Sequence, residues 1–126
     1  MTAMAVLAVG IGAALGAWLR WVLSTWFNPV APALPLGTLA ANLIGGYLVG
    51  VAVAYFAANS SIAPEWRLLC ITGFLGGLTT FSTFSAESVQ MLMSAQYGAA
   101  FAHTAAHLAG SLAATFAGFW TYRTFA

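Results

Sequence analysis

The segment from Gly73 to Glu87 carries aromatic rings and hydroxyl groups in a spacing that could hold an ion. Three of its residues, Phe81, Phe84 and Ser85, share one helix face at i, i+3 and i+4, and Ser88 just beyond the segment continues that face at i+7. Aromatic ring edges carry partial positive charge and hydroxyl groups donate hydrogen bonds, so this face suits a small anion better than a cation. An aromatic stripe that only packs against other helices explains the same pattern, and at this point both interpretations stand.

Glycine and threonine residues just before this face predict an interruption of the helix. Gly76 and Gly77 are followed by Thr79 and Thr80 near the middle of an apolar stretch, and these residue types are poor helix formers. Helices interrupted in the middle of a bilayer form ion and substrate sites, because the interruption frees carbonyl oxygens and NH groups. Alternatively, the glycines only admit a crossing helix while the threonine hydroxyls bond back to their own turn.

Polar residues also lie in two other apolar stretches: a lone asparagine in one and a set of four residues in the other. Asn42 lies about seven residues into its stretch, where an unpaired amide costs several kcal/mol, so it either bonds a neighbouring helix or faces a wet pathway. The residues of the second set share one helix face at i, i+3, i+7 and i+11: Thr104, His107, Ser111 and Thr115. Polar groups that continue along one face rarely contact lipid, so we expect this face to meet protein or water.

His103 lies one turn before His107, and such an i, i+4 pair could hold a metal ion. Two ligands without a third Cys, Asp or Glu nearby are a weak metal signal. We therefore expect these histidines to be hydrogen-bonded or to line a pore. The single cysteine, Cys70, excludes an intrachain disulfide and is expected to be a small packing residue.

Small residues recur every four positions on the first two apolar stretches and predict close helix packing. They are Gly12 and Gly16, followed by Arg20, on the first stretch, and Gly46 and Gly50, preceded by Asn42 and Thr38, on the second.

The composition indicates which solvent surrounds these elements. Of the 126 residues, 62% are hydrophobic and 4% are charged, whereas about a quarter of a soluble domain is charged. A chain with so few charges cannot cover a water-facing surface, so most of its solvent is lipid. The net charge is +1 with no run of Lys or Arg, which leaves no basis for nucleic-acid binding. No paired carboxylates, Walker loop or HExxH motif is present, so we expect no enzyme activity.

Four stretches reach the roughly 20 apolar residues that cross a bilayer, at about residues 3–24, 36–57, 67–93 and 99–122. We therefore predict an all-α membrane protein: a single transmembrane domain over residues 1–126 with four helices, the third interrupted at mid-membrane. Four crossings put both termini on one side with Arg67 and Arg123, while Arg20 lies near the other side. This weak charge bias permits insertion in both orientations, and hence an antiparallel homodimer.

Together these motifs resemble the bacterial fluoride-channel family (CrcB/Fluc) over essentially the whole chain. The longest matching motif is Gly73-Phe-Leu-Gly-Gly-Leu-Thr-Thr-Phe-Ser-Thr-Phe-Ser85. Shorter ones are Gly16-Ala-Trp-Leu-Arg20-Trp, Gly37-Thr-Leu-Ala-Ala-Asn42-Leu-Ile-Gly-Gly46, Pro64-Glu-Trp-Arg67 and Leu108-Ala-Gly-Ser111.

The resemblance implies a dual-topology antiparallel homodimer in the bacterial inner membrane, with two pathways for passive fluoride export that confers fluoride resistance. It assigns anion contact to the ring edges of Phe81 and Phe84, a pathway amide to Asn42 and a vestibule cation to Arg20. The implied hydroxyl track comprises Thr38, Ser82, Thr83, Ser85, Ser111 and Thr115, with Glu87 beside it.

The resemblance also implies a structural sodium ion on the dimer axis, held by the backbone carbonyls of Gly76 and Thr79 from both subunits. One departure concerns the last helix. His103 stands where the family is expected to carry Tyr, and His107 stands in place of a hydroxyl in the track.

Two other classes of protein fit part of the pattern. A proton-coupled exporter of the small multidrug-resistance type has a similar length and dual topology, but it needs a carboxylate inside the membrane, conventionally on the first helix. That stretch has no Asp or Glu here, and Glu87 is the sole candidate. A structural or assembly subunit without a transport path is the second alternative, and it predicts that Asn42, Phe81 and Phe84 can be exchanged for other packing residues.

Overall fold

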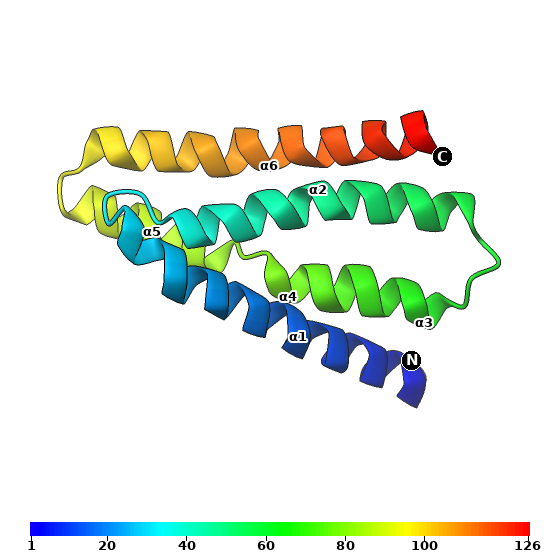
Figure 1. Cartoon of the computed structure of the whole chain (residues 1–126). Coiled ribbons are helices and arrows are strands. Elements are labelled where there is room, and N and C mark those ends of the chain that lie inside the picture. The colour runs from blue at the N-terminus through cyan, green and yellow to red at the C-terminus, as the bar shows by residue number, and fades with distance from the viewer.

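The computed structural model describes residues 1–126, and every regular element of the chain is helical (Figure 1). In chain order the elements are α1 (Ala3–Phe27), the 3₁₀ turn η1 (Asn28–Val30), α2 (Leu36–Ala58), α3 (Pro64–Arg67), the π-helix η2 (Leu68–Leu75), α4 (Gly76–Leu78), α5 (Ser82–Met93) and α6 (Tyr97–Phe125).

The ends of the helices follow local sequence signals. The hydroxyl of Thr2 accepts a hydrogen bond from the Ala5 NH at 3.1 Å and caps the start of α1. α1 continues to Phe27, three residues beyond the expected end, and gives way to η1 where Pro29 follows Asn28. α2 matches its expected range to within one residue.

The third segment is not the single α-helix with one interruption that the sequence predicted. α3, η2 and α4 follow one another without a gap from Pro64 to Leu78, and α5 begins only at Ser82. The eight residues of η2 form a π-helix, which the sequence did not lead us to expect. π-helical hydrogen bonds join each NH to the carbonyl five residues earlier, and such segments are frequent at functional sites.

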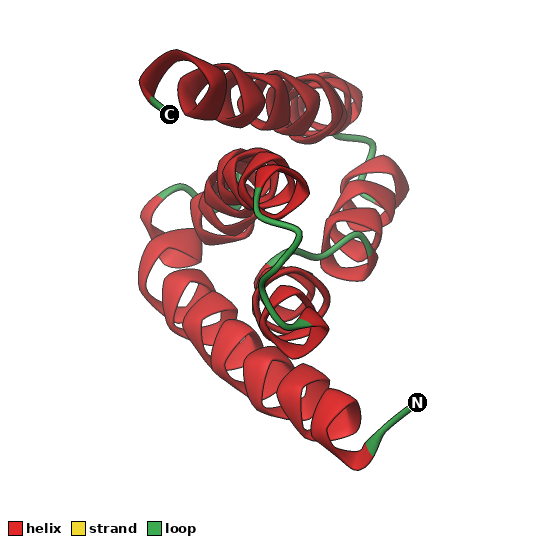
Figure 2. Cartoon of the chain, turned by 90° about the vertical axis from the view of Figure 1, so that its right-hand side faces the viewer, coloured by secondary structure: helices red, strands yellow, loops and turns green.

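Four long segments lie side by side, and both chain termini lie at the same end (Figure 1). Viewed along the helices (Figure 2), α6 forms one edge and α1 the other. α2 packs chiefly against α6, whereas α1 packs chiefly against η2 and α4. α5 and α6 form a helical hairpin around Ala95, which adopts the left-handed φ of 58°.

Glycines set the distance between the helices, as their spacing predicts. A Cβ added to Gly16 would lie 2.7 Å from the backbone nitrogen of Leu78, and one added to Gly50 would lie 2.9 Å from that of Phe119. Such contacts with backbone atoms are too close for any side chain. The spacing of these glycines therefore serves close approach of α1 to the third segment and of α2 to α6.

Three helical segments are long and apolar enough to cross a membrane: Ala3–Val30, Leu36–Ala58 and Pro64–Met93. α6 is not among them although it has 29 residues, because its polar stripe lowers its hydropathy. The buried apolar core is small, formed by Ala41, Leu75 and Leu78. Large apolar side chains instead cover the outside, as expected of a chain whose solvent is lipid.

Candidate anion site at the helix interruption

The interruption lies at Thr79, Thr80 and Phe81, where the sequence predicted it. Thr79 is extended, with φ −85° and ψ 154°, and ends α4. Its hydroxyl donates to the carbonyl of Leu75 at 2.8 Å, so it bonds back to its own turn. The Thr80 hydroxyl instead accepts the NH of Thr83, in the first turn of α5, at 3.0 Å. The interruption thus has a hydroxyl on each side that satisfies the backbone.

Asn42 of α2 holds the interruption from the side. Its Oδ1 accepts the Thr80 NH at 2.7 Å, and its Nδ2 donates to the Thr80 carbonyl at 2.9 Å. The same Nδ2 lies 2.9 Å from Nδ1 of His107 on α6. The amide therefore bonds to the interruption and to α6, and it also lines the cavity described next.

A cavity of about 330 Å³ opens at this point. It brings together five residues that the sequence selected for an ion pathway: Asn42, Phe81, Phe84, His107 and Ser111. The remaining lining comes from Gly46, Thr79, Thr80, Leu108 and Leu112. Residues from three segments far apart in the sequence therefore face one space, with aromatic rings, an amide and a hydroxyl around it.

The aromatic rings of the cavity differ in exposure. Phe84 is 5% exposed and stacks on His107, with ring centroids 4.8 Å apart and an interplanar angle of 26°. Phe81 is 72% exposed and meets Phe84 edge to face, with centroids 5.3 Å apart and planes at 75°. Phe84 is therefore fixed by the chain itself, whereas Phe81 stands at the rim of the cavity.

A second polar group lies beyond Phe84, toward the hairpin turn. Thr38 of α2 donates its hydroxyl to Glu87 Oε1 at 2.6 Å. Asn28 supports this contact because its Oδ1 accepts the Thr38 NH at 3.0 Å. Asn28 was not among the predicted site residues; its signal in the sequence is a polar side chain placed where the chain turns back beside α2.

The structure corrects the expectation that no third ligand lies near the two histidines. Glu87 Oε2 lies 3.2 Å from His103 Nε2, although sixteen residues separate them in the sequence. The hairpin turn explains this approach. Glu87 and His103 are each eight residues from Ala95, the turn residue, so the two helices place them opposite each other.

The other predicted site residues lie outside the cavity lining. Arg20 donates from Nε to the carbonyl of Gly77 at 3.0 Å. Thr115 donates its hydroxyl to the carbonyl of Gly46 at 2.9 Å, so this hydroxyl is already engaged. Three more lie along α5, half-buried or exposed: Ser82, Thr83 and Ser85. Of the expected hydroxyl track, Ser111 is thus the member that lines the cavity.

The fold and the site together define a multi-pass α-helical membrane protein with a polar cavity at an interrupted helix. The family model described as CrcB-like protein, Camphor Resistance (CrcB), matches residues 7–119, and the chain belongs to this family.

Proteins of known name that resemble the chain match it over almost its full length. One from Ralstonia pickettii (strain 12J) is 62% identical over 99% of both chains and is named fluoride-specific ion channel FluC. Proteins of the same name from Ralstonia nicotianae and Cupriavidus metallidurans are 59% identical, over 98% and 100% of both chains. The chain is accordingly an integral protein of the bacterial inner membrane.

Proposed function

We propose that this chain is a fluoride-selective channel that lets F⁻ leave the cytoplasm passively. Its relatives at 59 to 62% identity are named fluoride-specific ion channels. The observation that carries the proposal is the cavity itself, in which Phe81, Phe84, Asn42 and Ser111 surround the interrupted helix. The family is one of ion channels, so the activity is transport and not enzymatic catalysis.

The chemistry of the cavity suits fluoride. Fluoride is small and strongly hydrated, so a pathway must replace its water with closely spaced donors and positive ring edges. Asn42 Nδ2 supplies a donor whose direction is set by the Thr80 backbone, and Ser111 supplies a hydroxyl. An ion that enters takes the place of His107 Nδ1 as the acceptor for Asn42. Because His107 competes for the same donor, the ion is held weakly enough to leave.

Residues outside the cavity take the further roles in this proposal. Thr38, Ser82, Thr83, Ser85 and Thr115 continue the track on either side, with Glu87 beside it, and Arg20 supplies positive charge at its entrance. Export needs no energy source, because HF that enters the cell ionises inside. An inside-negative potential then favours exit of F⁻ by about 2.3 kcal/mol per 100 mV.

The working unit in this proposal is an antiparallel homodimer of four-span subunits. The length of α6 supports a fourth crossing, since 29 residues extend about 43 Å at 1.5 Å per residue. The 72% exposure of Phe81 and the 74% exposure of Leu112 support a second copy, which would cover the rim of the cavity. The arginines, two on one side and one near the other, support insertion in both orientations.

A sodium ion between the two copies fits the residues at the interruption. Gly76 is exposed on the chain surface, and Thr79 departs from helical geometry beside it. Carbonyls are the oxygen ligands that alkali cations take, and two from each copy would hold the ion by charge–dipole attraction. Its role is structural, and no step of fluoride passage involves it.

The exporter alternative is not favoured. α1 contains no carboxylate, and the names of the relatives refer to a channel. Growth of a fluoride-sensitive bacterium that expresses the chain tests the proposal. We expect the wild type to restore growth in fluoride, Phe84→Ile not to, and Phe125→Ile, which changes an exposed ring at the far end of α6 from the cavity, to behave as wild type. Failure of the wild type to restore growth, although it is present in the membrane, would contradict the proposal.

A further inference from the structure

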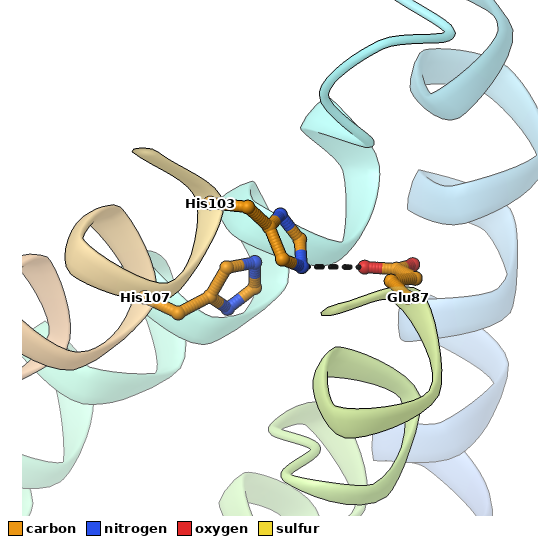
Figure 3. A group of neighbouring side chains, drawn as sticks. All are labelled: Glu87, His103 and His107. Carbon is orange, nitrogen blue, oxygen red and sulfur yellow. Dashed lines mark ion pairs between the residues drawn. The ribbon is translucent and has the colours of Figure 1, made fainter. Parts of the chain in front are cut away.

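One cluster of buried polar side chains is only partly explained by the proposed fluoride pathway. It consists of Glu87, His103 and His107. His103 is fully buried and His107 is 3% exposed. Figure 3 shows the Glu87 carboxylate of α5 directed at the His103 ring, with the His107 ring of α6 beside it. One ligand atom from each residue lies within 4.8 Å of the other two.

Four buried polar atoms of this cluster have no hydrogen-bond partner: Glu87 Oε2, His103 Nδ1, His103 Nε2 and His107 Nε2. The 3.2 Å approach of His103 to Glu87 therefore lacks the alignment of a hydrogen bond. Buried polar atoms in folded proteins nearly always meet a partner, which is protein, water or an ion. Because one atom from each of the three residues lies within 4.8 Å of the other two, a single ion between them would be a common partner.

We propose that Glu87, His103 and His107 form a binding site for a divalent transition-metal ion, with Zn²⁺ as the representative case. Imidazole nitrogens with one carboxylate are a ligand set that suits zinc, copper and nickel, whereas Mg²⁺ and Ca²⁺ prefer oxygen ligands alone. Ligands of a tetrahedral zinc site lie about 3.4 Å apart, so a shift of about 1 Å by each side chain completes the site.

The surroundings of the cluster support this assignment. Thr38 donates to the other oxygen of Glu87, which orients the carboxylate as outer-shell partners of metal ligands do. A separate polar cavity of about 160 Å³ adjoins Glu87, lined also by Gln90, Ser94 and Gln96 near the hairpin turn. Through this cavity a hydrated ion can reach Glu87, the first member of the cluster, from the end of the helices.

Metal binding is linked to the proposed fluoride cavity through His107. The Thr80 backbone fixes the Asn42 amide, so Nδ2 donates and His107 Nδ1 accepts. The neutral His107 ring then carries its proton on Nε2. A metal ion on Nε2 displaces this proton to Nδ1, which turns Nδ1 into a donor. Two donors, His107 Nδ1 and Asn42 Nδ2, then face the cavity and hold fluoride more tightly. An ion held more tightly leaves more slowly, so zinc is expected to slow conduction.

Calorimetric titration of the purified protein in detergent with Zn²⁺, and with Mg²⁺ as the control ion, tests the site. We expect one zinc ion per chain and no magnesium binding. His103→Phe, His103→Gln and Glu87→Gln should each weaken zinc binding by about tenfold or more. Cys70→Ala, which removes the single thiol of the chain, should bind zinc as the wild type does. The two His103 replacements differ in shape, so the test holds if one of them does not fold.

Absence of zinc binding to the wild type, or wild-type binding by the folded His103 variants, would overturn the site. The link to conduction rests on the proposed function and is measured separately, as zinc sensitivity of fluoride efflux from liposomes. Zinc should slow efflux through the wild type and not through His103→Gln, and fluoride should reciprocally tighten zinc binding. Zinc binding without an effect on efflux would refute the link alone, whereas no efflux even without zinc would refute the proposed function and leave the site standing.

Discussion

Replacement of Asn42 by alanine tests how the interrupted helix is held. Asn42 pairs with both the NH and the carbonyl of Thr80, at 2.7 and 2.9 Å, and with His107 at 2.9 Å. Asn42→Ala leaves the two backbone groups of Thr80 without these partners in a part-buried site. Each unsatisfied group costs about 1 to 3 kcal/mol, so we expect Asn42→Ala to lower the free energy of unfolding by about 2 to 6 kcal/mol.

The matched control is Asn59→Ala. Asn59 also donates from Nδ2 to backbone, to the Tyr55 carbonyl at 2.8 Å, but this contact is exposed at the end of α2. Water can replace the lost bond there, so we expect a cost of about 1 kcal/mol or less. The assay is denaturant unfolding in detergent micelles, followed by tryptophan fluorescence.

Efflux of fluoride from liposomes completes this test. We expect folded Asn42→Ala to conduct fluoride poorly, because the cavity loses the donor that the Thr80 backbone directs. Equal stabilities of the two variants, together with wild-type efflux through Asn42→Ala, would refute the reasoning that the amide holds both the interruption and the ion.

Four further outcomes are expected. Phe81→Ile and Phe84→Ile should each slow fluoride efflux about tenfold, which corresponds to a barrier raised by about 1.4 kcal/mol. The dimer should persist in size-exclusion chromatography, and unchanged efflux would refute the proposed contact of the rings with the anion. Gly16→Ala should cost about 1 to 3 kcal/mol by overpacking, since its Cβ meets the Leu78 backbone at 2.7 Å; Gly10→Ala, with nothing within 4 Å, is the control that should lose nothing. Removal of sodium should dissociate the dimer or stop conduction, measured by cross-linking and efflux, and indifference to sodium would refute the axial site. Tags on the C-terminus should be accessible from both membrane faces in similar amounts, and access from one face alone would refute dual topology.

Much of the site follows from local sequence because its signals are local. Consecutive glycines and threonines weaken a helix wherever they occur, which is why the interruption at Thr79 could be located before the structure. The spacing of Gly12, Gly16 and Gly50 likewise predicted close helix contacts. Asn42 was selected because a lone amide in an apolar stretch must have a partner.

Contacts between residues far apart in the sequence could not be predicted in this way, because they depend on how the chain folds back on itself. The approach of Glu87 to His103 requires a turn centred on Ala95. Ala95 has a left-handed backbone but is not a glycine, so the sequence carries no signal of this turn. The bond between Thr115 and Gly46 depends on the parallel register of α6 and α2. The π-helix η2 packs chiefly against α1, and no residue pattern in its sequence distinguishes it from an α-helix.

The central claim is selective passage of fluoride, and paired efflux from liposomes that hold the purified protein tests it most directly. Fluoride and chloride electrodes record the release of each anion from the same preparation. Rapid loss of fluoride while chloride stays inside is the result that a fluoride-selective channel predicts. Retention of both anions by protein shown to be folded and dimeric, or equal loss of both, would contradict it.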